Sequence, residues 1–134
     1  MSKHKVFSWP VRVYFQDTDA GGVVYHASYV NFMERSRTEW LRTFGYSNAG
    51  LMKELGMVFV VRSLKLDYLK PALLDDLLTV TSQIKEMGRS RVSIEQTVLR
   101  GDDVLIKGEV HLVCVDVKTF KPVSVPEVLR KHWD

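Results

Sequence analysis

The sequence has a single cysteine and no long apolar run, and each absence excludes a class of protein. Cys114 alone can form neither an internal disulfide nor a cysteine-based zinc site. No stretch of about 18 apolar residues occurs, so no membrane-spanning helix is expected. The basic residues 1–5 are not followed by the apolar segment of a secretory signal. These absences predict a cytoplasmic protein.

Charge of one sign is also scarce. The chain has 19 Lys and Arg against 16 Asp and Glu, a net charge of +3, with no run of five or six like charges. That excess suits a polyanionic small ligand or a membrane surface, and it is too weak to predict nucleic-acid binding. The length of 134 residues and the hydrophobic fraction of 46% predict one globular domain spanning residues 1–134.

One long helix is predicted over residues 27–44. At 100° per residue, one stripe of this segment is apolar or small and the opposite face is polar. Gly45 follows the last apolar residue, as a helix C-terminus favours. A shorter helix is predicted from Ser47, as its cap, to Leu55, with Gly56 ending it, and a third over residues 126–133. The long stripe comprises Tyr29, Met33, Ser36, Trp40 and Phe44.

Alternating apolar residues predict five strands. The first lies at residues 7–15, with Pro10 indicating an edge position. Four more follow the helices within residues 58–66, 78–84, 92–98 and 104–114, and the last three are separated by short breaks typical of hairpins. The predicted fold class is therefore α+β: an antiparallel sheet of about five strands with one long helix on a face. Both faces of the last strand carry apolar residues, which predicts self-association.

The segment that joins the first strand to the long helix carries the residues with chemical potential. It contains Asp17 and Asp19, the adjacent glycines Gly21 and Gly22, and His26. Glycines permit a close backbone approach to a ligand, and free N–H groups at the helix start can donate to an oxyanion. A carboxylate beside them could act as base or nucleophile on a carbonyl. Two alternatives stay open, namely a turn with purely structural residues and a metal site.

These residues resemble the YbgC-type acyl-CoA thioesterases, in the 4-hydroxybenzoyl-CoA thioesterase branch of the hotdog superfamily. The resemblance covers nearly the whole chain. It implies a hotdog fold, in which the sheet wraps the long helix, and dimers with a continuous sheet, paired into tetramers. The matching segments are Asp-Thr-Asp-Ala-Gly-Gly-Val-Val-Tyr-His at 17–26, Glu-Arg-Ser-Arg-Thr-Glu at 34–39, Val-Phe-Val-Val-Arg at 58–62, Asp-Tyr at 67–68, Leu-Asp-Asp at 74–76, Val-Cys-Val-Asp at 113–116 and Lys-Pro at 121–122.

Carried over by residue, the resemblance implies that Asp19 is the catalytic carboxylate and that the helix-start N–H near His26 polarises the thioester carbonyl. His26 itself matches the motif histidine. Family members commonly have Tyr-Glu before Asp-Thr-Asp, whereas this chain has Phe15 and Gln16 and so lacks that hydroxyl and that charge. Substrate contacts are further expected from four residues of the same loop: Asp17, Gly22, Val23 and Tyr25.

Position within the loop also favours Asp19 over Asp17. Only Asp19 directly precedes the flexible Ala20-Gly21-Gly22 segment, whereas Asp17 is expected to accept backbone hydrogen bonds and stiffen the loop. Coenzyme A carries several phosphate charges, so we expect basic residues at its entry. The candidates are Arg62, Arg89, Ser90 and Arg91.

The remaining polar residues have weaker predictions. Arg37 borders the apolar stripe of the long helix and is expected to pair with a carboxylate. Cys114 is expected in the core, and His111, midway along a strand, is expected to be structural.

The sequence thus predicts a homo-oligomeric acyl-CoA thioesterase that needs neither a metal nor an organic cofactor. The resemblance also implies an alternative, a scaffold protein associated with the Tol-Pal envelope system. Such a scaffold would contact acyl carrier protein and phospholipid synthesis enzymes, and its hydrolysis would be incidental. A hotdog dehydratase is less compatible with the motif.

Overall fold

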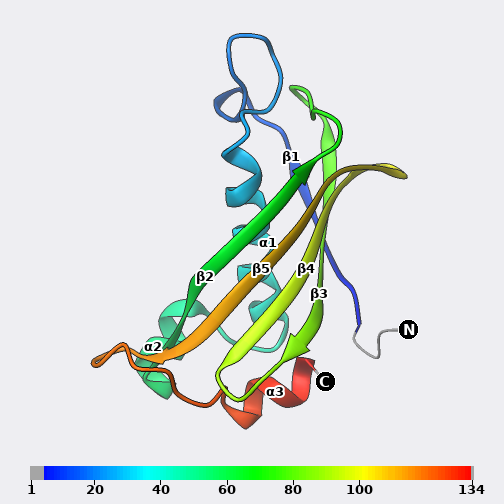
Figure 1. The fold of residues 1–134 in the computed structure, drawn as a ribbon. Helices are drawn as coiled ribbons and strands as arrows, with labels where there is room; N and C mark the ends of the chain where they lie inside the picture. The colour runs from blue at the N-terminus through cyan, green and yellow to red at the C-terminus, as the bar shows by residue number, and fades with distance from the viewer. Residues whose placement is uncertain (1–4, 134) are drawn as a thin grey trace.

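A computed structural model describes residues 5–133, and its centre is one antiparallel sheet (Figure 1). The spatial order of the strands is β1-β3-β4-β5-β2, so β1 and β2 form the two edges. The α+β class, the five strands and the edge position of the Pro10 strand are confirmed. The strands are β1 (Phe7–Arg12), β2 (Met57–Tyr68), β3 (Leu77–Met87), β4 (Arg91–Arg100) and β5 (Asp103–Asp116).

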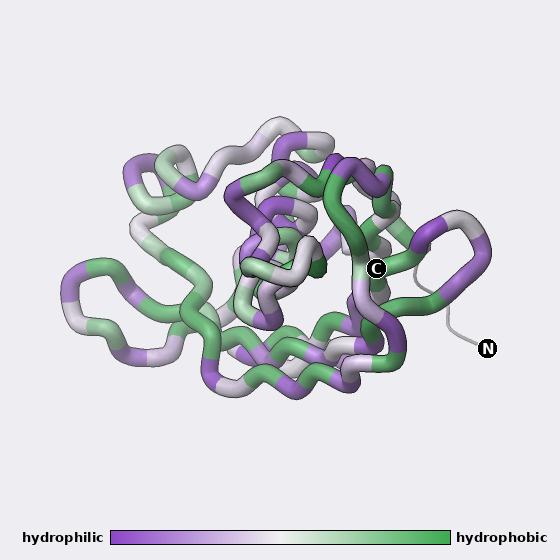
Figure 2. The backbone as a smooth tube through the Cα atoms, turned by 90° about the horizontal axis from the view of Figure 1, so that it is seen from above, coloured by the Kyte–Doolittle hydropathy of each residue, from purple (hydrophilic) through white to green (hydrophobic). Residues whose placement is uncertain are grey.

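The long helix α1 (Ser28–Thr43) lies in the concave side of the sheet, as Figure 2 shows from above. Its apolar stripe is buried as predicted, with Phe32 and Met33 almost fully enclosed. Gly45 follows the helix with φ of 89°, and the Tyr46 N–H donates to the Leu41 carbonyl, which closes the C-terminus. The predicted helix end is therefore confirmed.

Two shorter helices lie at the same end of the molecule, opposite the start of α1 (Figure 1), and both contribute to one core cluster. In α2 (Asn48–Leu55) the Ser47 Oγ accepts a hydrogen bond from the Gly50 N–H at 2.9 Å, and Gly56 ends the helix with φ of 62°. The C-terminal helix α3 (Glu127–Trp133) places the ring of Trp133 5.9 Å from that of Trp40 on α1. Both helices were predicted, α2 from Ser47 and Gly56 and α3 from Pro126 at its first turn.

The core fills the space between α1 and the inner residues of β3, β4 and β5. Cys114 is fully buried there, and burial raises the pKa of its thiol to about 11, so it is a core residue as predicted. Among residues 5–133, no helix is long and apolar enough to cross a bilayer.

One expectation about the sheet needs correction. Strand β1 ends at Arg12, and Phe15 lies in a short 3-10 turn, η1 (Phe15–Asp17), because the chain bends there toward α1. The open face of the sheet is polar rather than apolar, and Val115 is buried. Lys85, Glu95, Thr97, Lys107 and Glu109 share a shallow cavity on that face. The self-association predicted from the apolar residues of β5 stays a prediction.

Candidate active site

The loop from Tyr14 to Ala27 folds back on itself above the start of α1 (Figure 1). Thr18 and Val24 form an antiparallel bridge, and the Asp19 N–H donates to the Val23 carbonyl at 2.9 Å. The Gly22 N–H donates a hydrogen bond to the Asp19 carbonyl at 3.1 Å, and Gly22 has φ of 79°. This positive φ explains why glycine occupies the turn.

Asp17 holds the loop in shape. Its side chain is buried, and its Oδ2 accepts a hydrogen bond from the Tyr14 N–H at 2.8 Å. Its carbonyl accepts from the Tyr25 N–H at 2.9 Å and from the Ser28 hydroxyl at 3.3 Å. Asp17 therefore joins the turn to the first residue of α1, in line with the stiffening role expected from its place in the sequence.

Asp19 presents its carboxylate to solvent. Its Oδ1 accepts a hydrogen bond from the Gly21 N–H at 2.8 Å. Its Oδ2 has no hydrogen-bond donor within residues 5–133. One oxygen is thus held in place by the turn while the other stays available for chemistry.

The start of α1 lacks a side-chain cap. The residue before the helix is Ala27, which has no side-chain acceptor for the first N–H groups. Among the described residues, no group accepts a hydrogen bond from the N–H of His26 or Ala27. Unpaired N–H groups at a helix start, together with the helix dipole, favour an anionic oxygen.

His26 is exposed beside this helix start. Its ring lies 4.3 Å from that of Tyr25, and its carbonyl accepts a hydrogen bond from the Tyr68 hydroxyl at 3.0 Å. A small cavity of about 230 Å³ opens here between α1 and the end of β2. Its lining residues include Val24, His26, Tyr29, Tyr68 and Lys70.

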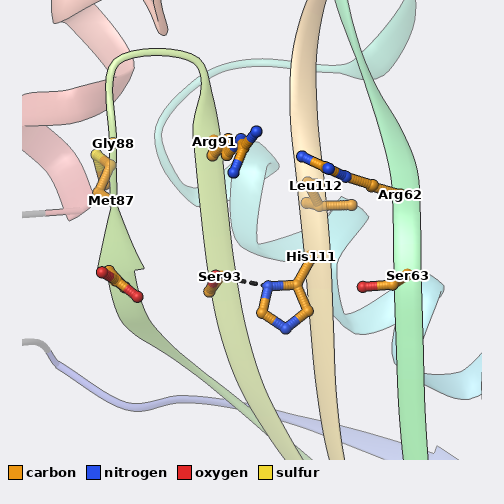
Figure 3. Close-up of a pocket in the computed structure, with 9 residues that line it drawn as sticks. Arg62, Ser63, Met87, Gly88, Arg91, Ser93, His111 and Leu112 are labelled. Atoms are coloured by element: carbon orange, nitrogen blue, oxygen red, sulfur yellow. Dashed lines mark hydrogen bonds between the residues drawn. The ribbon is translucent and has the colours of Figure 1, made fainter.

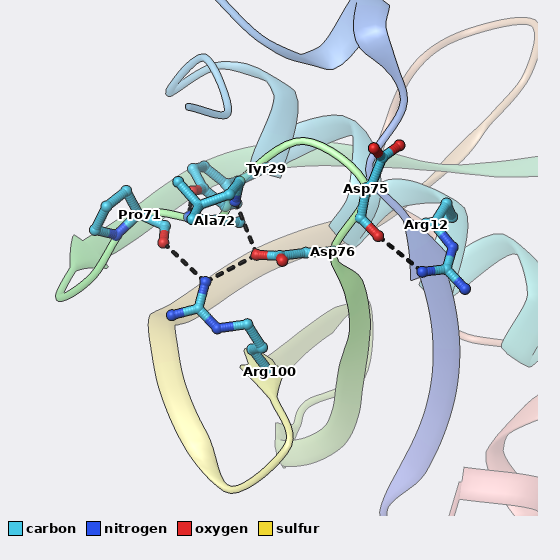
Figure 4. Close-up of polar contacts among 8 residues, drawn as sticks. Arg12, Tyr29, Pro71, Ala72, Asp75, Asp76 and Arg100 are labelled. Carbon is cyan, nitrogen blue, oxygen red and sulfur yellow. Dashed lines mark hydrogen bonds and ion pairs between the residues drawn. The ribbon is translucent and has the colours of Figure 1, made fainter. Parts of the chain in front are cut away.

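Hydrogen bonds to Asp76 and Tyr29 hold residues 72–73 in place, and we call this set of contacts the polar clamp (Figure 4). The Asp76 Oδ2 accepts from Arg100 at 2.8 Å and from the Leu73 N–H at 2.9 Å. The Tyr29 hydroxyl accepts from the Ala72 N–H at 2.9 Å. Because Leu73 bridges to Val23, this clamp fixes the segment on which the Asp19 loop rests.

The clamp makes stability depend on pH through Asp76. Burial alone would raise the pKa of Asp76, but the hydrogen bonds from Arg100 and Leu73 and the charge of Arg100 outweigh it, and the pKa falls below 3.8. A lowered pKa adds stability above the unfolded value, and this stability is lost as pH falls through the folded value. We expect Asp76→Asn to lower the free energy of unfolding at neutral pH by about 1 kcal/mol, allowing for solvent screening.

Urea denaturation of Asp76→Asn at neutral pH and well below pH 3.8 checks this expectation. The difference from the unaltered protein should shrink in acid. Asp75→Asn is the matched control, since Asp75 lies in the same loop and its carboxylate contacts no described partner. An equal loss at both pH values would contradict the role assigned to the Asp76 charge.

Arg62 and Arg91 meet on the outer face of the sheet (Figure 3). They come from β2 and β4 and line a cavity of about 430 Å³ together with Ser63, Gly88 and the neighbouring Glu86. In Figure 3 the two guanidinium groups extend toward one another across β5, with α1 behind the strands. Two of the four residues expected at the entry of coenzyme A are therefore brought together.

Arg89 and Ser90 do not line this cavity. They lie in the β3–β4 turn, where their carbonyls accept hydrogen bonds from the Val125 and Cys114 N–H groups. Arg130 also donates to the Arg89 carbonyl at 3.1 Å. The Arg89 carbonyl therefore holds the C-terminal segment against the sheet, while the Ser90 carbonyl bonds to β5.

His111 borders the same cavity. Its Nδ1 lies 2.8 Å from the Ser93 hydroxyl and its Nε2 lies 3.1 Å from Glu109, which also pairs with Lys85. Both ring nitrogens are therefore engaged on the outer face of the sheet.

The metal-site alternative has no support in the geometry. Within residues 5–133, no three His, Cys, Asp or Glu side chains lie close enough to hold an ion together. Asp17 is directed toward the Tyr14 N–H and Asp19 toward that of Gly21.

Comparison with known proteins identifies the family of this chain. The sequence model of the thioesterase-like superfamily matches residues 13–132. The chain belongs to the thioesterase-like superfamily. It is 46% identical over 124 residues to the acyl-CoA thioesterase YbgC of Haemophilus influenzae, covering 92% of this chain and 91% of that protein. The predicted resemblance to YbgC-type proteins is confirmed.

Further relatives of the superfamily agree in sequence and in fold. The chain is 46% identical over 123 residues to the acyl-CoA thioester hydrolase YbgC of Escherichia coli, covering 91% of each. The crystal structure of a probable thioesterase from Bartonella henselae superposes with a TM-score of 0.87 at 35% identity, covering 91% of this chain and 100% of that one. The hotdog fold is therefore confirmed.

The sequence analysis gave no role to Tyr68 and predicted the wrong partner for Arg37. Tyr68, the last residue of β2, donates to the His26 carbonyl; it lies in one of the segments that matched the family, but no role was predicted for it. Arg37 donates to the Gln96 amide oxygen at 2.9 Å rather than to a carboxylate, so that expectation was wrong. Gln96 could have been noticed as a polar residue at an inward position of β4, between Ile94 and Val98.

Proposed function

We propose that this chain is an acyl-CoA thioesterase, which hydrolyses the thioester to a free acid and coenzyme A. The observation that carries the proposal is the uncapped start of α1, whose His26 and Ala27 N–H groups have no described acceptor, beside the loop that exposes Asp19. Acyl transfer to water requires a donor pair for the oxyanion and a group that supplies the nucleophile.

The N–H groups at the start of α1 and the Asp19 carboxylate have separate roles in the reaction. The N–H groups near His26 hold the thioester oxygen as charge develops on it. Asp19 takes a proton from water as the water oxygen bonds to the acyl carbon, or bonds to that carbon itself and is freed by water in a second step. In either route the carbon–sulfur bond breaks and coenzyme A leaves as its thiol. The exposed His26 ring orients the substrate or water at the loop.

In one folded molecule, the Asp19 loop and the Arg62–Arg91 cavity lie toward opposite ends of the sheet. In Figure 1 the Asp19 loop is at the top, above the start of α1, and the β3–β4 turn is at the bottom. Strand β2 forms an edge of the sheet and pairs only with β5 within the described chain, and Val61 on it is 53% exposed. An edge of twelve residues is a surface for strand pairing.

We propose that two chains pair through their β2 edges into a two-fold dimer with one continuous sheet. Antiparallel pairing places the Arg62 and Arg91 cavity of one chain toward the Asp19 end of its partner. The two guanidinium groups then receive the phosphates of coenzyme A, for which Arg is well suited. In this arrangement Asp17, Gly22, Val23 and Tyr25 shape the loop at the reacting end, while Arg89 and Ser90 contribute backbone near the phosphates.

Subunit complementation tests the shared site. The variants are Asp19→Asn and the double variant Arg62→Ala with Arg91→Ala. We expect kcat/KM to fall in each alone, by about 10- to 100-fold for each lost charged contact of the double variant. A mixed dimer keeps one of its two sites intact, and random pairing of equal amounts makes about half of the dimers mixed. Refolding the two variants together should therefore restore about a quarter of the activity of the unaltered dimer.

Controls make the outcome unambiguous. Refolding each variant alone gives the baseline, and analytical ultracentrifugation measures the dimer in every sample. No recovery in a sample that contains mixed dimers would mean that both groups serve the same chain, and it would reject the shared site.

A thiol-release assay over short, long and aromatic acyl-CoAs separates hydrolysis from the scaffold alternative. High turnover on one class supports the enzyme, whereas uniformly feeble rates with tight binding of acyl carrier protein support a Tol-Pal-associated scaffold. The tetramer, the cytoplasmic location and the acyl carrier protein partner stay predictions.

A further inference from the structure

A second cavity lies between α1 and β2, away from the arginine cavity. Its volume is about 400 Å³, within the usual range for small-molecule sites. Most of its wall is apolar and comes from Val30, Leu41, Val58, Phe59, Val61 and Ile94. We call this cavity the α1–β2 slot.

One stripe of α1 lines the slot. Val30, Glu34, Arg37 and Leu41 are three or four residues apart and so face the same direction. The stripe begins two residues after the first residue of α1, so the slot extends away from the helix start at which the thioester is proposed to bind.

Arg37 is a half-buried cation in this apolar wall. It is held by Gln96, whose Oε1 accepts from the Arg37 Nη1 at 2.9 Å. Gln96 is fully buried, and its Nε2 donates to the Met33 carbonyl at 3.0 Å and to the Ser82 hydroxyl at 2.8 Å. These two acceptors orient the amide, so its oxygen faces the guanidinium.

The remaining donors of Arg37 have no described acceptor. No carboxylate within residues 5–133 lies within ion-pair distance of the guanidinium, and only the Nη1 bond to Gln96 is present. Burial lowers the pKa of Arg37, while the charge of Glu34 acts in the opposite direction. A partly desolvated cation without a counter-ion is costly unless a ligand supplies one.

We propose that the α1–β2 slot holds the acyl group and that Arg37 selects acyl chains that end in a carboxylate. A carboxylate matches the free Nε and Nη2 edge of a guanidinium as two parallel hydrogen bonds. The proposal rests on the thioesterase function, and it adds the chemical class of the acyl group and a residue that determines it.

The helix sets a length for such a chain. An Arg side chain on a helix leans toward the N-terminus, so the guanidinium lies near the turn of Glu34. At 1.5 Å per residue, this turn is about 12 Å along α1 from His26. An extended chain advances roughly 1.2 Å per bond, so about ten bonds join the thioester carbon to the distal carboxylate.

The experiment compares two series of acyl-CoAs with four to twelve carbons. One series ends in a methyl group and the other in a carboxylate, and kcat/KM is measured for each pair of equal length. With the unaltered protein, the carboxylate-ended substrate should be preferred in the upper part of this range. Arg37→Met should lower that preference by about 10- to 100-fold and favour the plain chains, since the methionine is apolar and of similar length.

Two further variants provide the controls. Arg35→Met removes the same charge from an exposed position of the same helix outside the slot, so the preference should stay that of the unaltered protein. Glu34→Gln removes a carboxylate that repels the ligand at the slot and should strengthen the preference.

Three outcomes would overturn the inference. The first is a preference for plain chains at every length in the unaltered protein. The second is a ratio that Arg37→Met leaves unmoved, and the third is an equal loss on both series, as expected if Arg37 only supports the fold or a subunit contact. Failure of the thioesterase function itself would look different, because the unaltered protein would then hydrolyse neither series.

Discussion

Asp19→Asn is expected to lower kcat for acyl-CoA hydrolysis by a factor of about 10² to 10⁴, the range for loss of a positioned acid–base group. The amide oxygen of asparagine can still accept the Gly21 N–H, as the Asp19 Oδ1 does at 2.8 Å. The loop should therefore keep its shape while it loses the basic oxygen. A thiol-release assay measures the rate, and circular dichroism with thermal melting checks the fold.

Asp75→Asn is a suitable control for this substitution, because it removes an exposed carboxylate from the adjoining loop. Its turnover should equal that of the unaltered protein. If Asp19→Asn retained full turnover, the catalytic assignment would be wrong. A single turnover in water labelled with heavy oxygen then tests the covalent route. Label in the Asp19 carboxylate shows that Asp19 attacked the thioester and that water opened the resulting anhydride at the Asp19 carboxyl carbon.

Gly108→Val is expected to destabilise the protein by about 1–3 kcal/mol, because it forces a side chain into a filled space. A Cβ at Gly108 would lie 2.6 Å from the Met33 Cε and 2.8 Å from the Leu66 Cδ2. Gly108 on β5 thus lets α1 approach the sheet closely. Urea denaturation measures the loss.

Two substitutions test whether contact with α1 is the cause. Lys107→Val changes the neighbouring residue on β5, which is exposed on the opposite face, so its effect should stay within about 0.5 kcal/mol. Met33→Ala removes the atoms that crowd the site, so the combination with Gly108→Val should cost at least about 0.5 kcal/mol less than the sum of the single changes. Strict additivity would show that the strain lies elsewhere.

Local chemistry accounts for what could be predicted from the sequence. Gly45 and the Ser47 cap gave the helix ends, because these signals act within one turn. Alternation gave the five strands, and the short breaks gave the hairpins. The place of Asp17 before a glycine turn gave its structural role, and the same loop gave Asp19 and His26 as candidates.

The end of β1 was predicted wrongly, because a side chain competes there for a backbone donor. Phe15 continues the alternation of the strand, yet the chain leaves the sheet after Arg12, since Asp17 captures the Tyr14 N–H and bends the backbone into η1. A pattern of apolar residues does not record where a side chain competes for a backbone donor.

The amino-acid order is sufficient to define the helices, the strands, the hairpins and the reactive loop of this thioesterase-like chain, because each depends on neighbours a few residues apart. Pairings across the chain depend on long-range packing, and no local pattern encodes them. They place β2 at the edge of the sheet, bring Arg62 beside Arg91, set Gln96 under Arg37 and require glycine at position 108 where α1 meets the sheet. These contacts join residues from about 29 to 75 positions apart in the sequence, and they form only when the sheet closes around the helix.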